Sequence, residues 1–471
     1  MIVALVVGPI VAGFVVYAFP NKSRAASKSF AVMVALGSLM LTWLAGGAPD
    51  ESARWLSRPF SAAFHLGIGG ISVWLALLLA LCTVCALLAS NVSRIRDFVA
   101  LLLMLEGSMM GLFLARDLLV FAVFWDLMLI PVFLLLLGWG RHPATAWRYI
   151  IYNFAGGLTL LIATAAFGIA FGSTDVIGKV GVTHLGNVWQ PWIFAGFAFS
   201  FLIKTPVWPL HTWMPPTYAD SPGPLAAIIG GVQSKAGLYG FIVIGMALLP
   251  ESMRAAAPLM FVLGLVALVY GALIALVQTD AKKIVAYSSL SHLGLILLAI
   301  FSFNGVALRG AVVYIIAHGL FSAALFLVIE FIEQREETRS LLRTGGLGAH
   351  NPKLAGAFII VALATLGLPG LAGFAGELII LSGLYAAGDV WPALIALVPI
   401  VIAAAYMLRL FQDMMNGPTV PDLPERRDMT LIEGIALAPL VLALVLVGVN
   451  PHPLTTFSDN GYSVSPLTVR K

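Results

Sequence analysis

Residues 201–240 read FLIKTPVWPLHTWMPPTYADSPGPLAAIIGGVQSKAGLYG. Lys204 lies inside an otherwise apolar helical pattern, and Pro206 and Pro209 follow it at once. After a polar, proline-rich corner the apolar pattern resumes and contains a second lysine, Lys235. A charged side chain at membrane depth costs at least about 2.5 kcal/mol, and proline frees backbone carbonyls that lipid cannot satisfy. We therefore interpret the stretch as part of an ion path that faces protein or water.

The composition is that of a membrane protein. The 471 residues are 60% hydrophobic and only 10% charged, which excludes a soluble globular domain. Apolar runs long enough to cross a bilayer recur from end to end, so we expect an all-α polytopic membrane protein without a soluble cofactor-binding domain. Because no basic region precedes the first run, it is expected to be retained. Fourteen transmembrane helices are predicted, near residues 2–19, 29–46, 69–90, 98–115, 118–139, 147–171, 191–214, 224–247, 257–278, 284–302, 309–332, 354–385, 389–411 and 431–449.

The distribution of basic residues predicts the orientation. Alternate connections, beginning with the first, hold sixteen of the 26 Lys and Arg residues, and the other connections and the tail hold eight. Cytoplasmic loops carry the excess of Lys and Arg, so both termini are expected on the outer side of the membrane. The net charge of +4 reflects this bias and gives no sign of a nucleic-acid partner.

The two cysteines, Cys82 and Cys85, form a CxxC pair inside the third predicted span. Zinc or iron–sulfur binding would need further ligands nearby, and a thioredoxin-type motif would need a soluble βαβ setting. We interpret the pair as small core residues and predict no metal site on this chain.

Two acidic residues are predicted at a similar membrane depth. Glu106 lies nine residues past Asp97, or about 14 Å along a helix. Asp126 lies nine residues past Asp117 in the next span. Either acid could be a carboxylate that is neutralised or hydrogen-bonded in helix packing, but two of them with two lysines downstream favour a functional role. A pair of Asp126 and Lys204 would be a minimal gate, because the lysine tends to release its proton when the acid moves away.

Two histidines occur on consecutive spans. His292 lies about 14 Å inward from Lys283 in the tenth span, and His318 lies at a similar depth in the eleventh. A lone histidine on an apolar face is usually a core residue. Two of them, flanked by small residues that admit water, favour a proton relay.

Three accessory candidates are predicted near the cytoplasmic edge. His211 and Asp220 follow the proline break and could feed protons inward, although His211 could equally be a polar cap on the broken helix. Lys282 marks the cytoplasmic end of the tenth span. The charge-rich linker at 333–353 is expected to be a solvated surface connection.

The twelfth span is expected to be interrupted in the same way as the seventh. Residues 366–377 read LGLPGLAGFAGE, so Pro369 and several glycines interrupt the helix before Glu377. Two interrupted helices in corresponding halves indicate an inverted-repeat transporter whose site lies at the breaks. A structural kink with an incidental acid is the alternative. The glycines near Glu377 are expected to leave room for water and for a Lys or His of another subunit.

The predicted organisation follows from this symmetry. Helices 1–3 occupy residues 1–95, the last helix and a short tail occupy residues 416–471, and two inverted five-helix repeats lie between them. The repeats are residues 96–250, which contain Lys235, and residues 251–415, which contain Glu377.

Five long motifs resemble the antiporter-like membrane-arm subunits of respiratory complex I, which are related to Mrp-type cation/proton antiporter subunits. They are IKTPVWPLHTWMPP, SKAGLYG, TDAKKIVAYSSLSHLG, AHGLFSAALF and LPGLAGFAGE, and the resemblance covers roughly residues 95–385. It implies fourteen helices, with the seventh and twelfth broken. The acid on the twelfth helix and the tail of about twenty residues, too short for a long lateral helix, resemble the M-type members.

The resemblance also implies roles for the residues above. Asp126 and Lys204 would form the gate, Lys235 the central switch, and Glu377 the outlet, with His292 and His318 on a hydrated axis between them. The family usually has glutamate at the position of Asp126. Aspartate is one methylene shorter, which favours a bridging water over direct contact with Lys204.

The implied function is proton translocation in the bacterial inner membrane, coupled to quinone reduction by NADH in other subunits. This chain would bind no redox cofactor, and FMN, iron–sulfur clusters and quinone are expected on partner subunits. Its partners would be other membrane-arm subunits, including neighbouring antiporter-like ones, and the lipid bilayer. The alternatives are a sodium/proton antiporter subunit of the Mrp type, a subunit of a membrane-bound hydrogenase, and a structural spacer with no working ion path.

Overall fold

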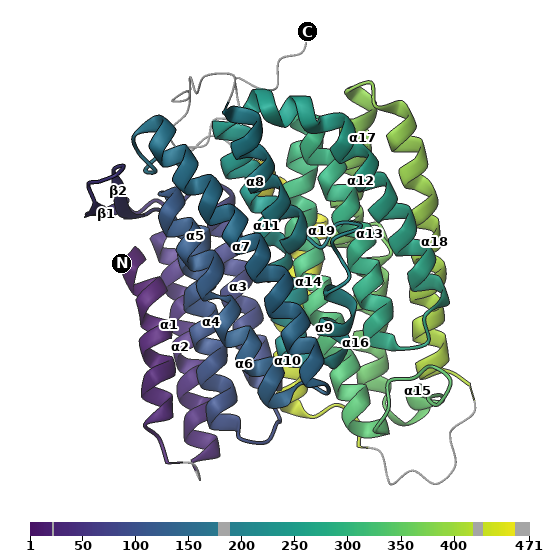
Figure 1. The fold of residues 1–471 in the computed structure, drawn as a ribbon. Coiled ribbons are helices and arrows are strands. Elements are labelled where there is room, and N and C mark those ends of the chain that lie inside the picture. The colour runs from purple at the N-terminus through teal and green to yellow at the C-terminus, as the bar shows by residue number, and fades with distance from the viewer. Residues whose placement is uncertain (21–22, 178–188, 418–426, 457–471) are drawn as a thin grey trace.

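The protein is a bundle of long helices that lie side by side (Figure 1). The structure is a computed structural model and describes residues 1–20, 23–177, 189–417 and 427–456. Within these residues, eleven helical segments are long and apolar enough to cross a membrane. They are α2 (Arg24–Ala45), α3 (Ile71–Ala89), α4 (Ile95–Leu114), α5 with α6 (Leu118–Leu127 and Leu129–Trp139), α7 (Pro143–Phe171), the segment Gly223–Met246, α12 (Pro250–Val277), α13 (Ala281–Phe301), α14 (Gly305–Glu336), α18 (Val390–Met415) and α19 (Leu431–Val449).

Shorter helices complete the bundle, and two pairs of them are separated by breaks at the predicted places. The helix α8 (Gln190–Lys204) ends at the lysine before the prolines, and α9 (Met214–Asp220) follows. In the same way α16 (Pro352–Thr365) is separated from α17 (Ala372–Ala386) by the turn that contains Pro369. The remaining helices are α1 (Ile2–Tyr17), α15 (Leu347–His350) and α20 (His452–Thr455).

A further helix is irregular where the sequence predicts a regular span. The segment Gly223–Met246 consists of α10 (Gly223–Gly231), the 3₁₀ turn η1 (Gln233–Lys235), α11 (Ala236–Gly240) and the π-helical η2 (Phe241–Met246). Lys235 therefore lies at a change of backbone geometry rather than inside a continuous α-helix. Such π-helical and 3₁₀ segments inside helices frequently mark functional sites.

The connection after α2 is a β-hairpin, a short exception in a mostly helical chain. Strand β1 (Glu51–Leu56) pairs antiparallel with β2 (Ala62–Leu66). The hairpin also attaches the N-terminus, because the ammonium group of Met1 lies 2.5 Å from the carboxylate of Glu51.

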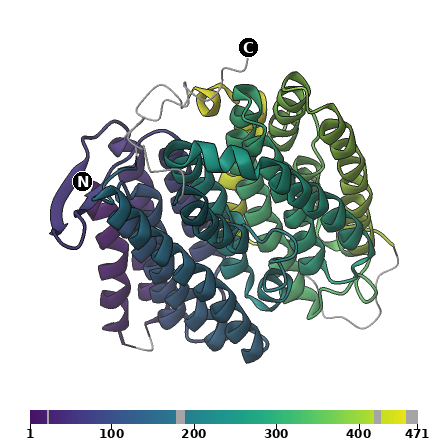
Figure 2. The ribbon, with the colours of Figure 1, turned by 45° about the horizontal axis from the view of Figure 1, so that its top comes forward.

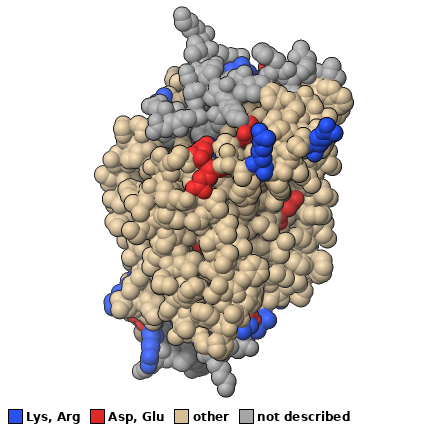
Figure 3. Space-filling view, turned by 90° about the vertical axis from the view of Figure 1, so that its left-hand side faces the viewer, with Lys and Arg blue, Asp and Glu red and all other residues tan. Residues whose placement is uncertain are grey.

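The outer surface and the core are both apolar. Trp43, Ile162 and Val401 each expose about 70% of their surface, whereas the apolar window of α14 is wholly buried at the centre of the bundle. Charged side chains gather toward the two ends of the face in Figure 3. Figure 2 shows the N-terminal helices on one flank and the later green helices on the other, with the central helices between them. The chain is thus an integral multi-pass membrane protein.

Candidate functional site

Three buried side chains form a continuous hydrogen-bonded chain at the centre of the bundle. The hydroxyl of Tyr314 on α14 donates to Oε1 of Glu377 on α17 at 2.6 Å. The same hydroxyl lies 2.5 Å from Nδ1 of His292 on α13. Tyr314 is fully buried, and the two partners are each 5% exposed. Because α17 begins after the break at Pro369, the break positions Glu377 opposite α14.

The second histidine and the second lysine belong to the same centre. The rings of His292 and His318 lie 5.6 Å apart between centroids. Lys235, which has no exposed surface, interacts electrostatically with both histidines. Its ammonium donates to the carbonyl oxygen of Gly230 and, at 3.2 Å, to Oγ of Ser234. Lys235 ends the turn η1, and Gly230 lies near the end of α10, so the contact joins the two segments.

Asp126 and Lys204 are neighbours without direct contact. Lys204, at the C-terminus of α8, is 1% exposed and interacts electrostatically with Asp126. Its ammonium forms no hydrogen bond to any residue that the structure describes. It lies instead 5.1 Å from the centroid of the Trp125 ring. The carboxylate of Asp126 rests against Gly157 of α7. The separation agrees with the shorter side chain of aspartate.

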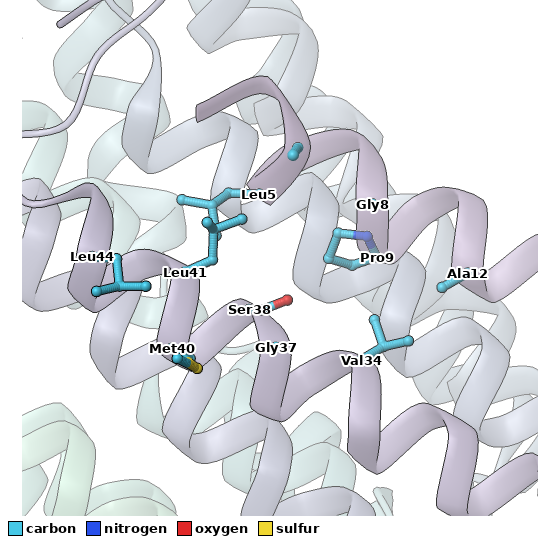
Figure 4. A pocket seen from close by; sticks show the side chains of 11 residues that line it. Leu5, Gly8, Pro9, Ala12, Val34, Gly37, Ser38, Met40, Leu41 and Leu44 are labelled. Atoms are coloured by element: carbon cyan, nitrogen blue, oxygen red, sulfur yellow. The ribbon is translucent and has the colours of Figure 1, made fainter. Parts of the chain in front are cut away.

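The neighbours of Glu106 are residues other than Asp126 and Lys204. Glu106 is fully buried on α4 near Ser38 of α2, and its two carboxylate oxygens form no hydrogen bond to a residue that the structure describes. Ser38 also lines a pocket of about 470 Å³ between α1 and α2 (Figure 4). The structure thus connects Glu106 with the first helices of the chain.

His211 lies in the break between α8 and α9. It is 4% exposed, and its ring centroid lies 5.4 Å from that of Tyr270 and 6.5 Å from that of Tyr287. The residue is therefore held among aromatic rings of α12 and α13 inside the bundle.

Lys282 belongs to an ionic network, and Asp220 is held by hydrogen bonds. The ammonium of Lys282 lies 3.1 Å from the carboxylate of Glu330 and 2.9 Å from that of Glu333. The carboxylate of Asp220 accepts a hydrogen bond from Thr145 at 2.5 Å. Both accessory candidates are fixed by local partners.

The same network corrects the expectation of a solvated linker at 333–353. Arg339 is only 8% exposed and pairs with Asp280 at 2.8 Å, and Glu336 is only 4% exposed. The linker folds onto the end of the bundle because Arg339 pairs with Asp280, which lies between α12 and α13.

The predictions for the two cysteines and for the glycines near Glu377 have different outcomes. Cys82 and Cys85 are buried free thiols on α3, as a packing role requires. The glycines near Glu377 do not hold room for water. A Cβ on Gly376 would lie 2.6 Å from Cδ2 of Tyr314, and one on Gly373 would overlap the carbonyl oxygen of Ala364. These glycines allow α17 to approach its neighbours closely.

Sequence reasoning missed Tyr314. Its only local signal is its position one helical turn before His318 in the motif YIIAH, residues 314–318. A tyrosine in an apolar helix is otherwise indistinguishable from a packing residue.

Comparisons with known proteins agree on one family. The sequence profile described as NADH:quinone oxidoreductase/Mrp antiporter, TM, matches residues 115–403. The NADH-quinone oxidoreductase subunit M of Rhodobacter capsulatus is 32% identical over 478 residues, which cover 95% of this chain and 92% of that protein. A chain in the structure of respiratory complex I from Thermus thermophilus with bound NADH is 30% identical, with a TM-score of 0.90 and coverage of 100% of both chains. A chain of the Mrp complex from Dietzia has a TM-score of 0.85 over 99% of this chain, but at 21% identity it shows a likeness of fold alone.

Proposed function

The chain belongs to the NADH:quinone oxidoreductase/Mrp antiporter membrane family, and we propose that it is the proton-translocating M-type subunit of a NADH–quinone oxidoreductase. The observation that carries this is the match over nearly the whole length to a subunit M at 32% identity. The chain contributes proton movement to the enzyme, and the redox chemistry belongs to other subunits. FMN, iron–sulfur clusters and quinone are assigned to those partners.

The proposed path uses the buried titratable groups in sequence. Asp126 and Lys204 form the gate, in which the charge of one stabilises the charge of the other. Lys235 is the switch, since a cation in a low-dielectric core responds strongly to any nearby change of charge. His292 and His318 connect it to Glu377, the outlet. Glu106, His211, Asp220 and Lys282 are accessory groups at the edges of the path.

The finer architecture is also proposed. Fourteen transmembrane helices result if α1, the broken pair α8–α9 and the broken pair α16–α17 are added to the eleven long segments. Residues 96–250 and 251–415 then form two inverted repeats, flanked by residues 1–95 and 416–471. Support comes from the two breaks, which each fall in the fourth helix of their repeat.

The assignment of sides and partners follows the same reasoning. The end of the bundle that holds Lys282, Arg339 and Arg141 is assigned to the cytoplasm by its basic residues, which puts both termini on the outer side of the bacterial inner membrane. The partners are the neighbouring membrane-arm subunits, antiporter-like ones among them. The apolar outer faces contact these subunits and lipid.

Isolation of the chain with its native partners tests this function. A tagged chain purified from its own membranes is expected to bring with it flavin and iron–sulfur absorption and NADH–quinone reductase activity. In vesicles, NADH should drive proton uptake that does not require sodium. A preparation without flavin or iron that exchanges sodium for protons would favour the Mrp-type alternative instead. Co-purified hydrogenase activity would favour the alternative of a membrane-bound hydrogenase subunit.

A further inference from the structure

We propose that Tyr314 is a relay residue, which passes protons between His292 and Glu377 through its hydroxyl group. This inference rests on the proposed function of the chain in proton translocation. It assigns a role to a side chain that belongs neither to the proposed gate, Asp126 with Lys204, nor to the proposed outlet, Glu377.

The geometry that carries the inference is a pair of short contacts on one oxygen atom. The phenol oxygen of Tyr314 lies 2.6 Å from Oε1 of Glu377 and 2.5 Å from Nδ1 of His292. No direct hydrogen bond joins His292 to Glu377 among the described residues, so the hydroxyl is the atom that they share. Because the three groups come from α13, α14 and α17, this oxygen joins three helices in one polar chain.

The burial of these three side chains makes the Tyr314 hydroxyl more important as the link between His292 and Glu377. Tyr314 has no exposed surface, and the phenyl ring of Phe321 lies 5.4 Å from the ring of His292, between centroids. Bulk water therefore does not surround the pair. A proton that moves between a buried histidine and a buried carboxylate needs a group that can both donate and accept, which a tyrosine hydroxyl can do.

The transfer balances without any co-reactant. When His292 is the imidazolium, with protons on both Nδ1 and Nε2, and Glu377 is ionised, the Tyr314 hydroxyl donates to Oε1 and its oxygen accepts the Nδ1 proton. The phenol O–H bond breaks as an O–H bond forms on Glu377. The Nδ1–H bond of His292 breaks as a new phenol O–H bond forms, so His292 ends neutral with its proton on Nε2, Tyr314 ends neutral, and one proton has moved to Glu377.

The same contact couples the charge of Glu377 to the tautomer of His292. With Glu377 ionised, the tyrosine oxygen is free to accept from Nδ1–H, and the lone pair of neutral His292 is on Nε2, where an incoming proton binds to give the imidazolium. After transfer, the new phenol O–H bond is directed to Nδ1 instead. The hydroxyl has to rotate back before the next proton, and release of the proton from Glu377 permits this rotation.

Other titratable groups face the hydrogen-bonded side chains His292, Tyr314 and Glu377 from each side. Tyr406 on α18 interacts electrostatically with Tyr314 and Glu377, and its hydroxyl lies 2.9 Å from Oγ of Ser288. On the opposite side are His318 and Lys235. Tyr406 is thus a buried tyrosine near the acid but without a hydrogen bond to it among the described residues, which makes it a matched control.

The test uses the intact complex in vesicles with the variant Tyr314→Phe, which removes only the hydroxyl. We expect proton uptake per NADH oxidised to fall at least tenfold, with assembly unchanged, and Tyr406→Phe to pump as the wild type does. Infrared difference spectra should also change. The carbonyl stretch of protonated Glu377, identified by its loss in Glu377→Gln, should shift in Tyr314→Phe and stay in place in Tyr406→Phe.

Each other outcome has a definite meaning. Full pumping by Tyr314→Phe, or an unshifted carboxyl band, overturns the relay. Full pumping by Glu377→Gln overturns instead the proposed outlet, and with it the function on which the relay rests. If Tyr314→Phe does not assemble, difluorotyrosine at position 314 keeps the size and the hydroxyl but makes it more acidic. The pumping rate and its solvent isotope effect should then change, and an unchanged isotope effect would also overturn the relay.

Discussion

The carboxylate of Asp126 on α5 rests against the backbone of Gly157 on α7, with no space between them for a methyl group. The glycine therefore determines where the carboxylate lies. This matters because Asp126 acts on Lys204 through space rather than through a hydrogen bond. A small displacement of the carboxylate changes the field at the lysine directly.

The first prediction is that Gly157→Ala weakens the proposed gate of Asp126 and Lys204. The new Cβ would overlap Oδ1 of Asp126 and push the carboxylate from its position, so NADH-driven proton uptake in vesicles should fall at least tenfold. The adjacent variant Gly156→Ala is the control, because its Cβ would lie 3.4 Å from Cδ1 of Ile203, an ordinary contact. Equal pumping by the two variants would mean that the position of Asp126 does not matter.

A second prediction concerns Lys235. Replacement by Met keeps the apolar length of the side chain and removes the cation, so pumping should be lost and coupled quinone reduction slowed while the complex still assembles. Lys353→Met, at an exposed position, should have no effect. Both variants are measured for proton uptake and for NADH–quinone reductase activity. Wild-type pumping without the Lys235 ammonium would leave that residue a packing role only.

Much of the fold could be predicted because its signals are local. Proline next to a buried charge indicates a broken helix, and the breaks after Lys204 and around Pro369 lie where the sequence predicts them. The irregular backbone at Lys235 could not be predicted, since no proline marks it. The hairpin after α2 is short and its first strand is largely exposed, so its pattern is weak beside the long apolar runs.

The ionisable groups of the candidate site could be predicted from the sequence, but the hydrogen bonds that join them could not. A buried Lys, His or Glu is conspicuous in apolar sequence, so His292 and Glu377 stand out on composition alone. What joins them is Tyr314, from a third helix, and its hydroxyl becomes significant only when α13, α14 and α17 pack together. The same limit applies to Arg339, whose partner Asp280 is distant in sequence.

The ionic network at the bundle end is expected to stabilise the fold. Lys282 is 2% exposed and contacts two carboxylates, of Glu330 and Glu333. Removal of one member of a buried ion pair costs about 3–5 kcal/mol, because it leaves uncompensated charge. Lys282→Met should therefore lower the thermal unfolding temperature in detergent, whereas Lys283→Met, at the next and exposed position, should not. Identical melting curves would show that the carboxylates are solvated or protonated without the lysine.

The last prediction separates the packing of α17 from the chemistry of its acid. Gly376 allows α17 to lie against Tyr314, since a Cβ at this position would come within 2.9 Å of the tyrosine Cα and 2.6 Å of its Cδ2. Gly376→Ala must therefore move α17 away from α14, and the hydrogen bond from Tyr314 to Glu377 should lengthen even though both groups remain.

Two measurements on Gly376→Ala distinguish the causes. Overpacking of a well-packed core costs about 1–3 kcal/mol, so both the unfolding temperature and proton uptake should fall. Gly356→Ala on α16, which has open space around its Cβ, should retain both or gain stability through better helix propensity. Tyr314→Phe, by contrast, should lose pumping with little change in unfolding temperature. If Gly376→Ala melts early but pumps fully, the close approach of α17 to α14 serves stability alone and proton transfer tolerates a longer bond.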